Sequence, residues 1–389
     1  MVSEPYGGRL INRVLAGRER ERRLSDAKEM ISIEVDRGAI LDAEKIATGA
    51  YSPLEGFMSS TDYYNVVRNE TLENGLPWTI PIILAPREEH DAGITGELRD
   101  GDEVALYYLG EPFAILHVEE RFRFDKRELA EKVFRTVDVR HPNVKELFNM
   151  GGILLAGGVD LIQRVDHVLS RYELTPLETR RIFSEMRWEK IAAYQTRNPP
   201  HMAHEYIQRC TLEMVDGILI HPVTELKEDD FPPQATVEGY EFLIKNFYPK
   251  NRAVLATLSI QMRYAGSRAA IFLAIVRKNY GCTHFVVGRD IAGVGDYYEP
   301  YEAHEAMKGL DIGIEPIFFR ESFYCKRCRG IVSERTCGHT GDDHVRISMS
   351  EVRHIISSGK EPPPQTVRPE IARILKRHLG TAEDPQRST

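Results

Sequence analysis

The 389-residue sequence predicts a multidomain α/β protein, and three observations support this fold class. The N-terminal third reads mainly as short β-strands. The central third alternates short apolar runs with longer helical ones, and the C-terminal part holds a cysteine cluster. A chain of this length exceeds one ordinary domain. We therefore expect three domains, which cover residues 1–168, 169–320 and 321–389.

The first domain is expected to be rich in β-structure. Between Ile31 and about Arg123 the apolar residues come in short runs broken by Gly, Pro and Asp, which is typical of strands and turns. Residues 101–118 predict a hairpin with its turn at Gly110-Glu111-Pro112. An amphipathic helix is expected from about Lys126 to Val137, before a Gly-rich stretch that leads into the next domain.

The central domain is expected to contain a parallel sheet, because strands that alternate with helices of ten or more residues need crossover connections. Ligands in such sheets bind at the carboxyl ends of the strands. The last domain is expected to end in two helices, 350–358 and 369–379, with a frayed tail after Thr381. The predicted central strands are 191–196, 217–221, 253–260 and 283–288, and the predicted helices are 201–214, 237–247 and 268–278.

Composition excludes several classes of protein. The formal net charge of −8 and the pI near 6 argue against a protein whose main task is to neutralise a nucleic-acid backbone. Apolar residues make up 42% of the chain, and none of their runs approaches the length of a membrane span. The polar segment Met1–Arg23 lacks an apolar signal region. We therefore expect a cytoplasmic protein without nucleic-acid or membrane partners.

The densest candidate site is the segment Gln195–His204, where a predicted strand stops and a helix begins. The free amides and the positive dipole end of a helix form an anion site. His201 and His204 are three residues apart, so both project from one side of the first turn. Arg197 can offer a planar donor fork to a tetrahedral oxyanion. The segment therefore predicts a phosphate or oxyanion site.

Two histidines at this spacing could instead bind a metal ion or be ordinary surface residues. The neighbouring Gln195, Arg197 and Asn198 at the strand end favour phosphate binding.

A second candidate segment, 283–295, is a strand that leads into a Gly-rich loop with Arg289 and Asp290. Glycines let the backbone approach a ligand closely, and the loop amides can cradle an anion. As a motif this pattern is weak, because a Gly-rich loop after a strand is more often only a turn.

The cysteine cluster predicts a metal site. Cys325, Cys328, Cys337 and His339 have the spacing Cys-x₂-Cys-x₈-Cys-x-His, and three thiolates with one imidazole suit a closed tetrahedral Zn²⁺ site. Reduced thiols without a metal are the alternative. Four protein ligands leave no coordination position for catalysis, so the expected zinc is structural.

Several long segments of the chain resemble the ATP sulfurylases, also called sulfate adenylyltransferases. The resemblance is carried by residues 195–204, 262–268 and 277–290, by 47–58 near the start and by 368–375 near the end. It runs nearly end to end. The chain has no Gly-x-x-x-x-Gly-Lys-Ser/Thr loop, so it resembles the prokaryotic type with a zinc site and without a P-loop kinase domain.

The resemblance implies an N-terminal PUA-like domain, a central nucleotidylyl-transferase domain of the Rossmann-like HUP class, and a small C-terminal zinc-bearing α/β domain. The implied reaction is reversible and joins ATP and sulfate to give adenosine 5′-phosphosulfate and pyrophosphate. Mg²⁺ would accompany ATP, and the family implies a homo-oligomer, most simply a dimer.

The resemblance also assigns the site residues. Gln195 and Arg197 would bind the sulfate oxygens together with the backbone near Ala292. The expected catalytic residues are Thr196, Arg197, Asn198, His201 and His204. The residues expected to contact ATP are Gln195, Asn198, His201, His204, Gly288, Arg289, Asp290 and Ile291.

Three residues depart from the family pattern. Ile291 stands where the family usually has His, and Ser267 and Val294 stand where it usually has Pro. Ile291 puts in question any polar side-chain contact to ATP at this position. The backbone contacts are unaffected by the change.

The implied chemistry needs no general base, because sulfate is fully ionised at neutral pH. The barrier lies in bringing two anions together, which requires positioning and charge compensation. Two other functions were weighed. One is a nucleotidylyl transferase of the same fold with another oxyanion acceptor, and the other is an RNA-binding module built from the PUA-like and zinc regions, which the acidic net charge disfavours.

Overall fold

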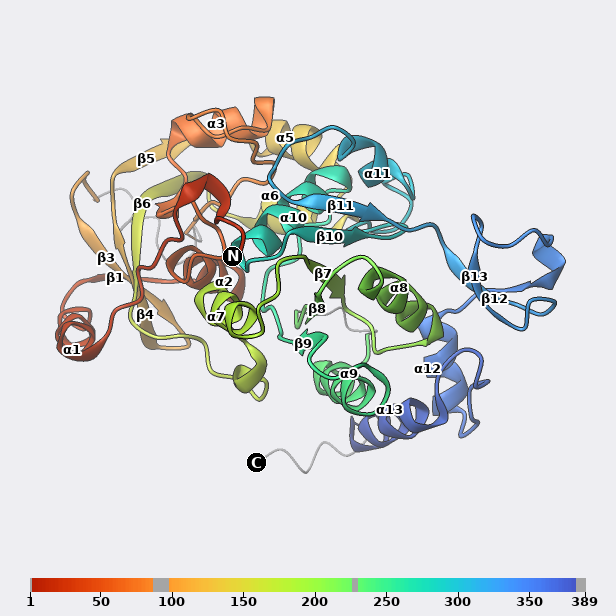
Figure 1. Ribbon diagram of the computed structural model, residues 1–389. Helices are drawn as coiled ribbons and strands as arrows, with labels where there is room; N and C mark the ends of the chain where they lie inside the picture. Colours follow the sequence, from red (N-terminus) through yellow and green to blue (C-terminus); the bar gives the residue numbers. More distant parts are fainter. Residues whose placement is uncertain (1, 87–97, 226–229, 383–389) are drawn as a thin grey trace.

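The computed structural model describes residues 2–86, 98–225 and 230–382. Figure 1 shows the N-terminal strands at one end, a central sheet with helices in the middle, and a small β-structure that projects at the other end. This arrangement confirms the multidomain α/β fold class. Among the described residues, no helix combines the length and the apolar character that a membrane crossing requires.

The N-terminal part is built on a six-stranded sheet in the order β1-β3-β4-β6-β2, with β5 also paired to β6. β1 is parallel to β3, and the other pairs are antiparallel. The predicted hairpin is present as β3 and β4. The strand bounds are β1 Ile31–Glu34, β2 Gly56–Phe57, β3 Glu103–Tyr108, β4 Glu111–His117, β5 Glu120–Arg123 and β6 Ile153–Leu161.

The predicted turn of this hairpin was misplaced. It lies at Leu109 and Gly110 instead of Gly110-Glu111-Pro112, because these two residues have φ values of 53° and 77°. Two consecutive positive φ values make the two-residue loop that matches the twist of paired strands.

The N-terminal part also contains helices that were not predicted, because the sequence analysis expected mainly β-structure there. α2 spans Arg37–Ala47 and begins at the cap Asp36, and α3 spans Ser60–Asn69 and begins at the cap Ser59. The helix predicted over 126–137 ends at Phe134, because its last turn is π-helical and Arg135 is left-handed with φ 57°. The other helix bounds are α1 Gly17–Asp26, α5 Lys126–Leu129 and α6 Pro142–Asn149.

The central sheet is parallel throughout, as predicted, with the order β11-β10-β7-β8-β9. The strand predicted over 253–260 ends at Leu255, and the edge strand β11 was not predicted. The strand bounds are β7 Ile191–Thr196, β8 Gly217–Pro222, β9 Ala253–Leu255, β10 His284–Val287 and β11 Glu315–Phe318. The helix bounds are α7 Pro176–Glu185, α8 Met202–Leu212, α9 Pro233–Phe247, α10 Ser267–Asn279 and α11 Glu302–Ala306.

Helices cover both faces of this sheet. Along β7, Ala192 and Tyr194 pack in the apolar cluster with α8 and α9, whereas Ile191 and Ala193 belong to the cluster that includes α10. The chain builds the sheet outward in both directions from β7, so the strand order reverses between β7 and β10. Ligands of doubly wound sheets bind at such a switch point, at the carboxyl ends of the strands.

The N-terminal part and the central sheet share one apolar core. Phe272 of α10 packs against Tyr51 and Trp78, with ring centroids 5.2 and 5.5 Å apart. These aromatic contacts join the N-terminal part to α10, one of the helices that cover the central sheet.

A buried ion triad ties these two parts together, and its loss gives a stability prediction. The Lys45 ammonium lies 2.8 Å from Glu44 and 3.0 Å from Glu173, and all three side chains are buried. Lys45→Met would remove the cation between two buried carboxylates and leave Glu44 only the Arg164 guanidinium at 3.3 Å. We expect the free energy of unfolding, measured with urea, to fall by about 3–5 kcal/mol. The exposed Lys28→Met is the control, and equal losses in the two variants would contradict this role.

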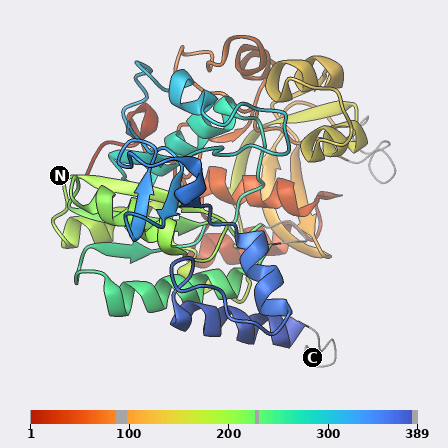
Figure 2. The same cartoon turned by 90° about the vertical axis from the view of Figure 1, so that its right-hand side faces the viewer.

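The C-terminal part contains a three-stranded sheet that projects from the body of the molecule (Figure 1) and two helices, both of which were predicted. Figure 2 views this end face-on. Arg368, just before α13, forms two hydrogen bonds of 2.6 and 2.9 Å to Glu205 of α8. Most of the predicted tail lies outside the described residues. The bounds are β12 Ser322–Cys325, β13 Gly330–Ser333, β14 His344–Val345, α12 Met349–Ser357 and α13 Pro369–Ala382.

Candidate active site

A cleft of about 420 Å³ lies at the carboxyl ends of β7 and β10, at the switch point of the sheet. All the side chains predicted for the nucleotide and oxyanion sites line this one cleft, although they come from two segments about ninety residues apart in the sequence. Those residues are Gln195, Thr196, Arg197, Asn198, His201, His204, Gly288, Arg289, Asp290, Ile291 and Ala292.

The turn after β7 is fixed by Thr196. Its hydroxyl donates to the Asn198 carbonyl at 3.1 Å and accepts from the Asn198 backbone N–H at 3.0 Å. Beside it, the side-chain oxygen of Gln195 is buried and has no hydrogen-bond partner among the described residues. Buried polar atoms normally have partners. Rotation of this amide would present its NH₂ group to an oxyanion, so Gln195 is suited to a ligand with acceptor oxygens.

His201 caps the N-terminus of α8. Its Nδ1 accepts the backbone N–H of His204 at 3.3 Å, and the two rings stack with centroids 3.6 Å apart. The Nδ1 of His204 lies 3.1 Å from the Tyr240 hydroxyl. Burial lowers the pKa of both imidazoles below the usual value of 6.5. At neutral pH both rings are therefore uncharged, and because Nδ1 of His201 is an acceptor, its proton lies on Nε2.

Positive charge in the cleft comes from arginines. Arg197 Nε lies 4.0 Å from Asp230 Oδ2, and Arg289 Nη1 lies 3.9 Å from Glu321 Oε1. Arg320, which the sequence analysis missed, also lines the cleft and lies over the Tyr301 ring at 4.3 Å. Three guanidinium groups beside a helix N-terminus make this cleft suited to polyanions.

The loop after β10 carries backbone strain. Asp290 and Ala292 have φ values of 55° and 58°, in the left-handed region that non-glycine residues rarely adopt. Such outliers collect at functional sites. Between them, Ile291 is partly buried and packs against the core, so this position can offer a ligand its backbone but no polar side-chain atom.

Gly288 gives a test of this loop. A Cβ built on it would meet no atom within 4 Å, so the substrate-free protein should accept alanine without loss of stability. The added methyl group would occupy space in the cleft. We expect Gly288→Ala to raise the KM of a substrate bound in the cleft about tenfold at unchanged melting temperature. Gly380→Ala, which also meets no atom, is the control remote from the cleft; unchanged kinetics in Gly288→Ala would place the substrate elsewhere.

The predicted metal ligands lie together in the projecting sheet. The ligand atoms of Cys325, Cys328, Cys337 and His339 are all within 4.8 Å of one another. Cys328 and Cys337 Sγ are 3.8 Å apart, and His339 Nδ1 lies 3.2–3.5 Å from the three sulfur atoms. Bonds of about 2.3 Å to sulfur and 2.0–2.1 Å to nitrogen in a tetrahedron give separations of this size. The geometry therefore fits a metal ion such as zinc.

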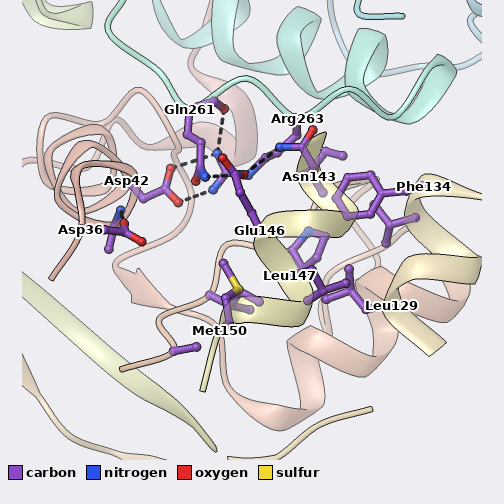
Figure 3. A pocket seen from close by; sticks show the side chains of 16 residues that line it. Asp36, Asp42, Leu129, Phe134, Asn143, Glu146, Leu147, Met150, Gln261 and Arg263 are labelled. Carbon is purple, nitrogen blue, oxygen red and sulfur yellow. Dashed lines mark hydrogen bonds and ion pairs between the residues drawn. The ribbon is translucent and has the colours of Figure 1, made fainter. Parts of the chain in front are cut away.

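A second cavity, shown in Figure 3, lies behind the cleft and has a volume of about 60 Å³. Its wall is apolar at one end, where Leu129, Phe134 and Leu147 lie, and polar at the other, where Asp42 pairs with Arg263. It is far too small for a nucleotide. The cleft at the switch point, which brings the predicted residues together, is the candidate active site.

Comparison with known proteins agrees with this geometry. Residues 170–378 match the family model described as ATP-sulfurylase, and residues 3–164 match a PUA-like domain. The chain is 46% identical over 377 residues to a sulfate adenylyltransferase of Ignicoccus hospitalis, with 96% of this chain and 98% of the relative covered. A sulfate adenylyltransferase of Thermococcus onnurineus is also 46% identical, over 378 residues, with coverage of 97% and 98%.

Among solved structures, the chain is similar to one described as a hexameric APS kinase from Thiobacillus denitrificans. The TM-score is 0.75 at 25% sequence identity, and the match covers 97% of this chain and 68% of that one. The family model matches more than half of the chain, and the similarity to the relatives extends over nearly its full length. The matched residues include both segments that line the cleft at the switch point. This chain belongs to the ATP-sulfurylase family.

Proposed function

We propose that this chain is a sulfate adenylyltransferase, which converts ATP and sulfate to adenosine 5′-phosphosulfate and pyrophosphate. The observation that carries the proposal is the cleft at the carboxyl ends of β7 and β10, which Arg197, Arg289 and Arg320 line together with the first residues of α8. Relatives that cover nearly the whole chain carry the same activity in their names.

In the proposed reaction, a sulfate oxygen attacks the α-phosphorus of ATP. The new O–P bond forms as the bond to the β-phosphate oxygen breaks, and pyrophosphate leaves with that electron pair. No proton is transferred, because sulfate and the leaving group are both anions. The residues of the cleft therefore act by positioning the two anions and by offsetting their charge.

The proposed roles are those that the family resemblance implies for residues that all line this cleft. Gln195 and Arg197 bind the sulfate oxygens with the Ala292 backbone, and Thr196 and Asn198 shape the turn at the reacting centre. His201 and His204 act as uncharged hydrogen-bonding groups toward the ATP phosphates.

The loop after β10 binds nucleotide through Gly288, Arg289, Asp290 and the backbone of Ile291. ATP enters as its magnesium complex, and Asp290 and Glu321 are the carboxylates that line the cleft where such a cation could be held.

The remaining features of the proposal concern the whole molecule. The domains are 1–168, 169–320 and 321–389, and the zinc is structural, held by the four ligands described above. A cytoplasmic location and a homodimer are also predicted, and sedimentation of the purified protein would check the latter.

The experiment that tests the activity is pyrophosphate release from ATP in the presence of Mg²⁺ and one oxyanion at a time. We expect release that depends on sulfate and is accompanied by adenosine 5′-phosphosulfate. Release with another oxyanion but none with sulfate would favour the second candidate, a nucleotidylyl transferase of the same fold with a different acceptor.

A further inference from the structure

Residues 261–264 form a segment that separates the active-site cleft from the small cavity of Figure 3. Gln261 and Arg263 line the small cavity, whereas Met262 and Tyr264 line the cleft. Successive side chains of extended backbone point to opposite sides. Contacts made on the cavity side therefore fix the side chains that face the cleft.

The side chain of Asn143, in α6, binds this segment much as a neighbouring strand would. Its Nδ2 donates to the Met262 carbonyl at 3.0 Å, and its Oδ1 accepts the Tyr264 backbone N–H at 2.8 Å. His141 Nε2 lies 2.8 Å from the Tyr264 carbonyl oxygen. Both backbone polar groups of Tyr264 are thus held by buried side chains at the start of α6.

Ionic contacts hold the other side of the segment. Arg263 Nη1 donates to Asp42 at 3.1 Å and to the Gln261 carbonyl at 3.1 Å. Glu146 accepts hydrogen bonds of 3.2 Å from both Gln261 and Asn143 (Figure 3). The segment is therefore attached to α2 and α6, and it has little freedom to shift relative to the cleft.

On the cleft side, the Tyr264 side chain reaches the guanidinium group of Arg197. Burial raises the pKa of Tyr264, although the Arg197 charge opposes this effect, so the hydroxyl is neutral at pH 7. A neutral hydroxyl oxygen can accept from one edge of the planar guanidinium. The other N–H groups of the Arg197 guanidinium then point in a defined direction.

We propose that Asn143 and Tyr264 are positioning residues for sulfate: Asn143 fixes Tyr264, and Tyr264 orients Arg197 toward the oxyanion. This inference rests on the proposed function, because it takes Arg197 to be the sulfate-binding arginine. Neither residue needs to touch the substrate.

A double-mutant cycle tests the inference. Calorimetric titration of the whole protein with inorganic sulfate, in the presence of a non-hydrolysable ATP analogue, would compare wild type, Tyr264→Phe, Asn143→Ala and the double variant. We expect each single change to weaken sulfate binding about tenfold, with the affinity for the ATP analogue unchanged. The double variant should be no weaker than the singles, because Asn143 acts through Tyr264.

The control is Leu147→Ala, which removes a buried apolar side chain of α6 that lines the cavity. Leu147 takes no part in the hydrogen bonds to the segment 261–264 described above. It should lower stability and leave sulfate binding intact. Additive losses in the double variant, or an equal loss in Leu147→Ala, would overturn the inference while the proposed function stands. If the wild type binds sulfate and the double variant is no weaker than the single variants, but no product forms, the proposed function alone is overturned. If the wild type binds no sulfate, the inference and the proposed function are both overturned.

Discussion

Arg197→Ala is expected to lower kcat for adenosine 5′-phosphosulfate formation by about 10²–10³. Arg197 lies on the turn directly after β7, before the N-terminus of α8, and its planar fork can make two parallel hydrogen bonds to one tetrahedral oxyanion. A steady-state assay with varied sulfate and saturating ATP measures the effect. Arg197→Lys should recover only part of the activity, because an ammonium group carries the charge without the fork.

The control for this prediction is Arg181→Ala. Arg181 is an exposed arginine of α7 that pairs with Glu185 and does not line the cleft. Its replacement should leave kinetics unchanged. Equal activity in Arg197→Ala and Arg181→Ala, with both variants folded, would show that sulfate binds elsewhere.

Removal of the metal is expected to lower kcat/KM about 10²-fold without unfolding the central sheet. The predicted metal ligands flank the hairpin of β12 and β13. Glu321 and Ile347, which lie on either side of this module in the sequence, line the cleft. Structural zinc supplies the folding energy of such small modules. Once the module loosens, the cleft groups attached to it are misplaced, and small misplacements are costly for catalysis.

Cys337→Ser tests this prediction together with chelation of the wild type. We expect one zinc per chain in the wild type by atomic absorption, loss of that zinc in Cys337→Ser, and parallel loss of activity. Cys210→Ser, which changes a half-buried cysteine outside the cluster, should keep both zinc and activity. Full activity in the zinc-free protein would contradict a supporting role of the module.

The parts of the site that could be predicted from sequence are those encoded by local pattern. The run that ends at Thr196 and the run that ends at Val287 both appear as apolar strands followed by polar loops, so the residues after them could be placed at one sheet edge. The four predicted metal ligands lie within fifteen residues, from Cys325 to His339, so their spacing alone predicts the metal site.

The parts that could not be predicted depend on tertiary contacts. Arg320 reaches the cleft only because β11 pairs with β10, and β11 is too short to stand out in the sequence. Tyr264 carries no local pattern that would connect it to Arg197. Leu109 adopts a positive φ that residue preferences disfavour, so the hairpin turn was placed one residue too late.

The protonation state of His201 is a further property that sequence could not give. A histidine pair beside arginines suggests positive charge, but burial and the capping bond to the His204 amide keep the His201 ring neutral. Charge compensation in the cleft therefore depends on the arginines, which keep their charge when buried.

The central claim is tested most directly by ATP formation from adenosine 5′-phosphosulfate and pyrophosphate, with Mg²⁺, by the purified wild type and by the His201→Ala/His204→Ala double variant. We predict that the wild type makes ATP and that the double variant, folded and with its zinc retained, loses this activity by orders of magnitude. A wild-type protein that contains its zinc and makes no ATP would contradict the assignment of sulfate as the substrate.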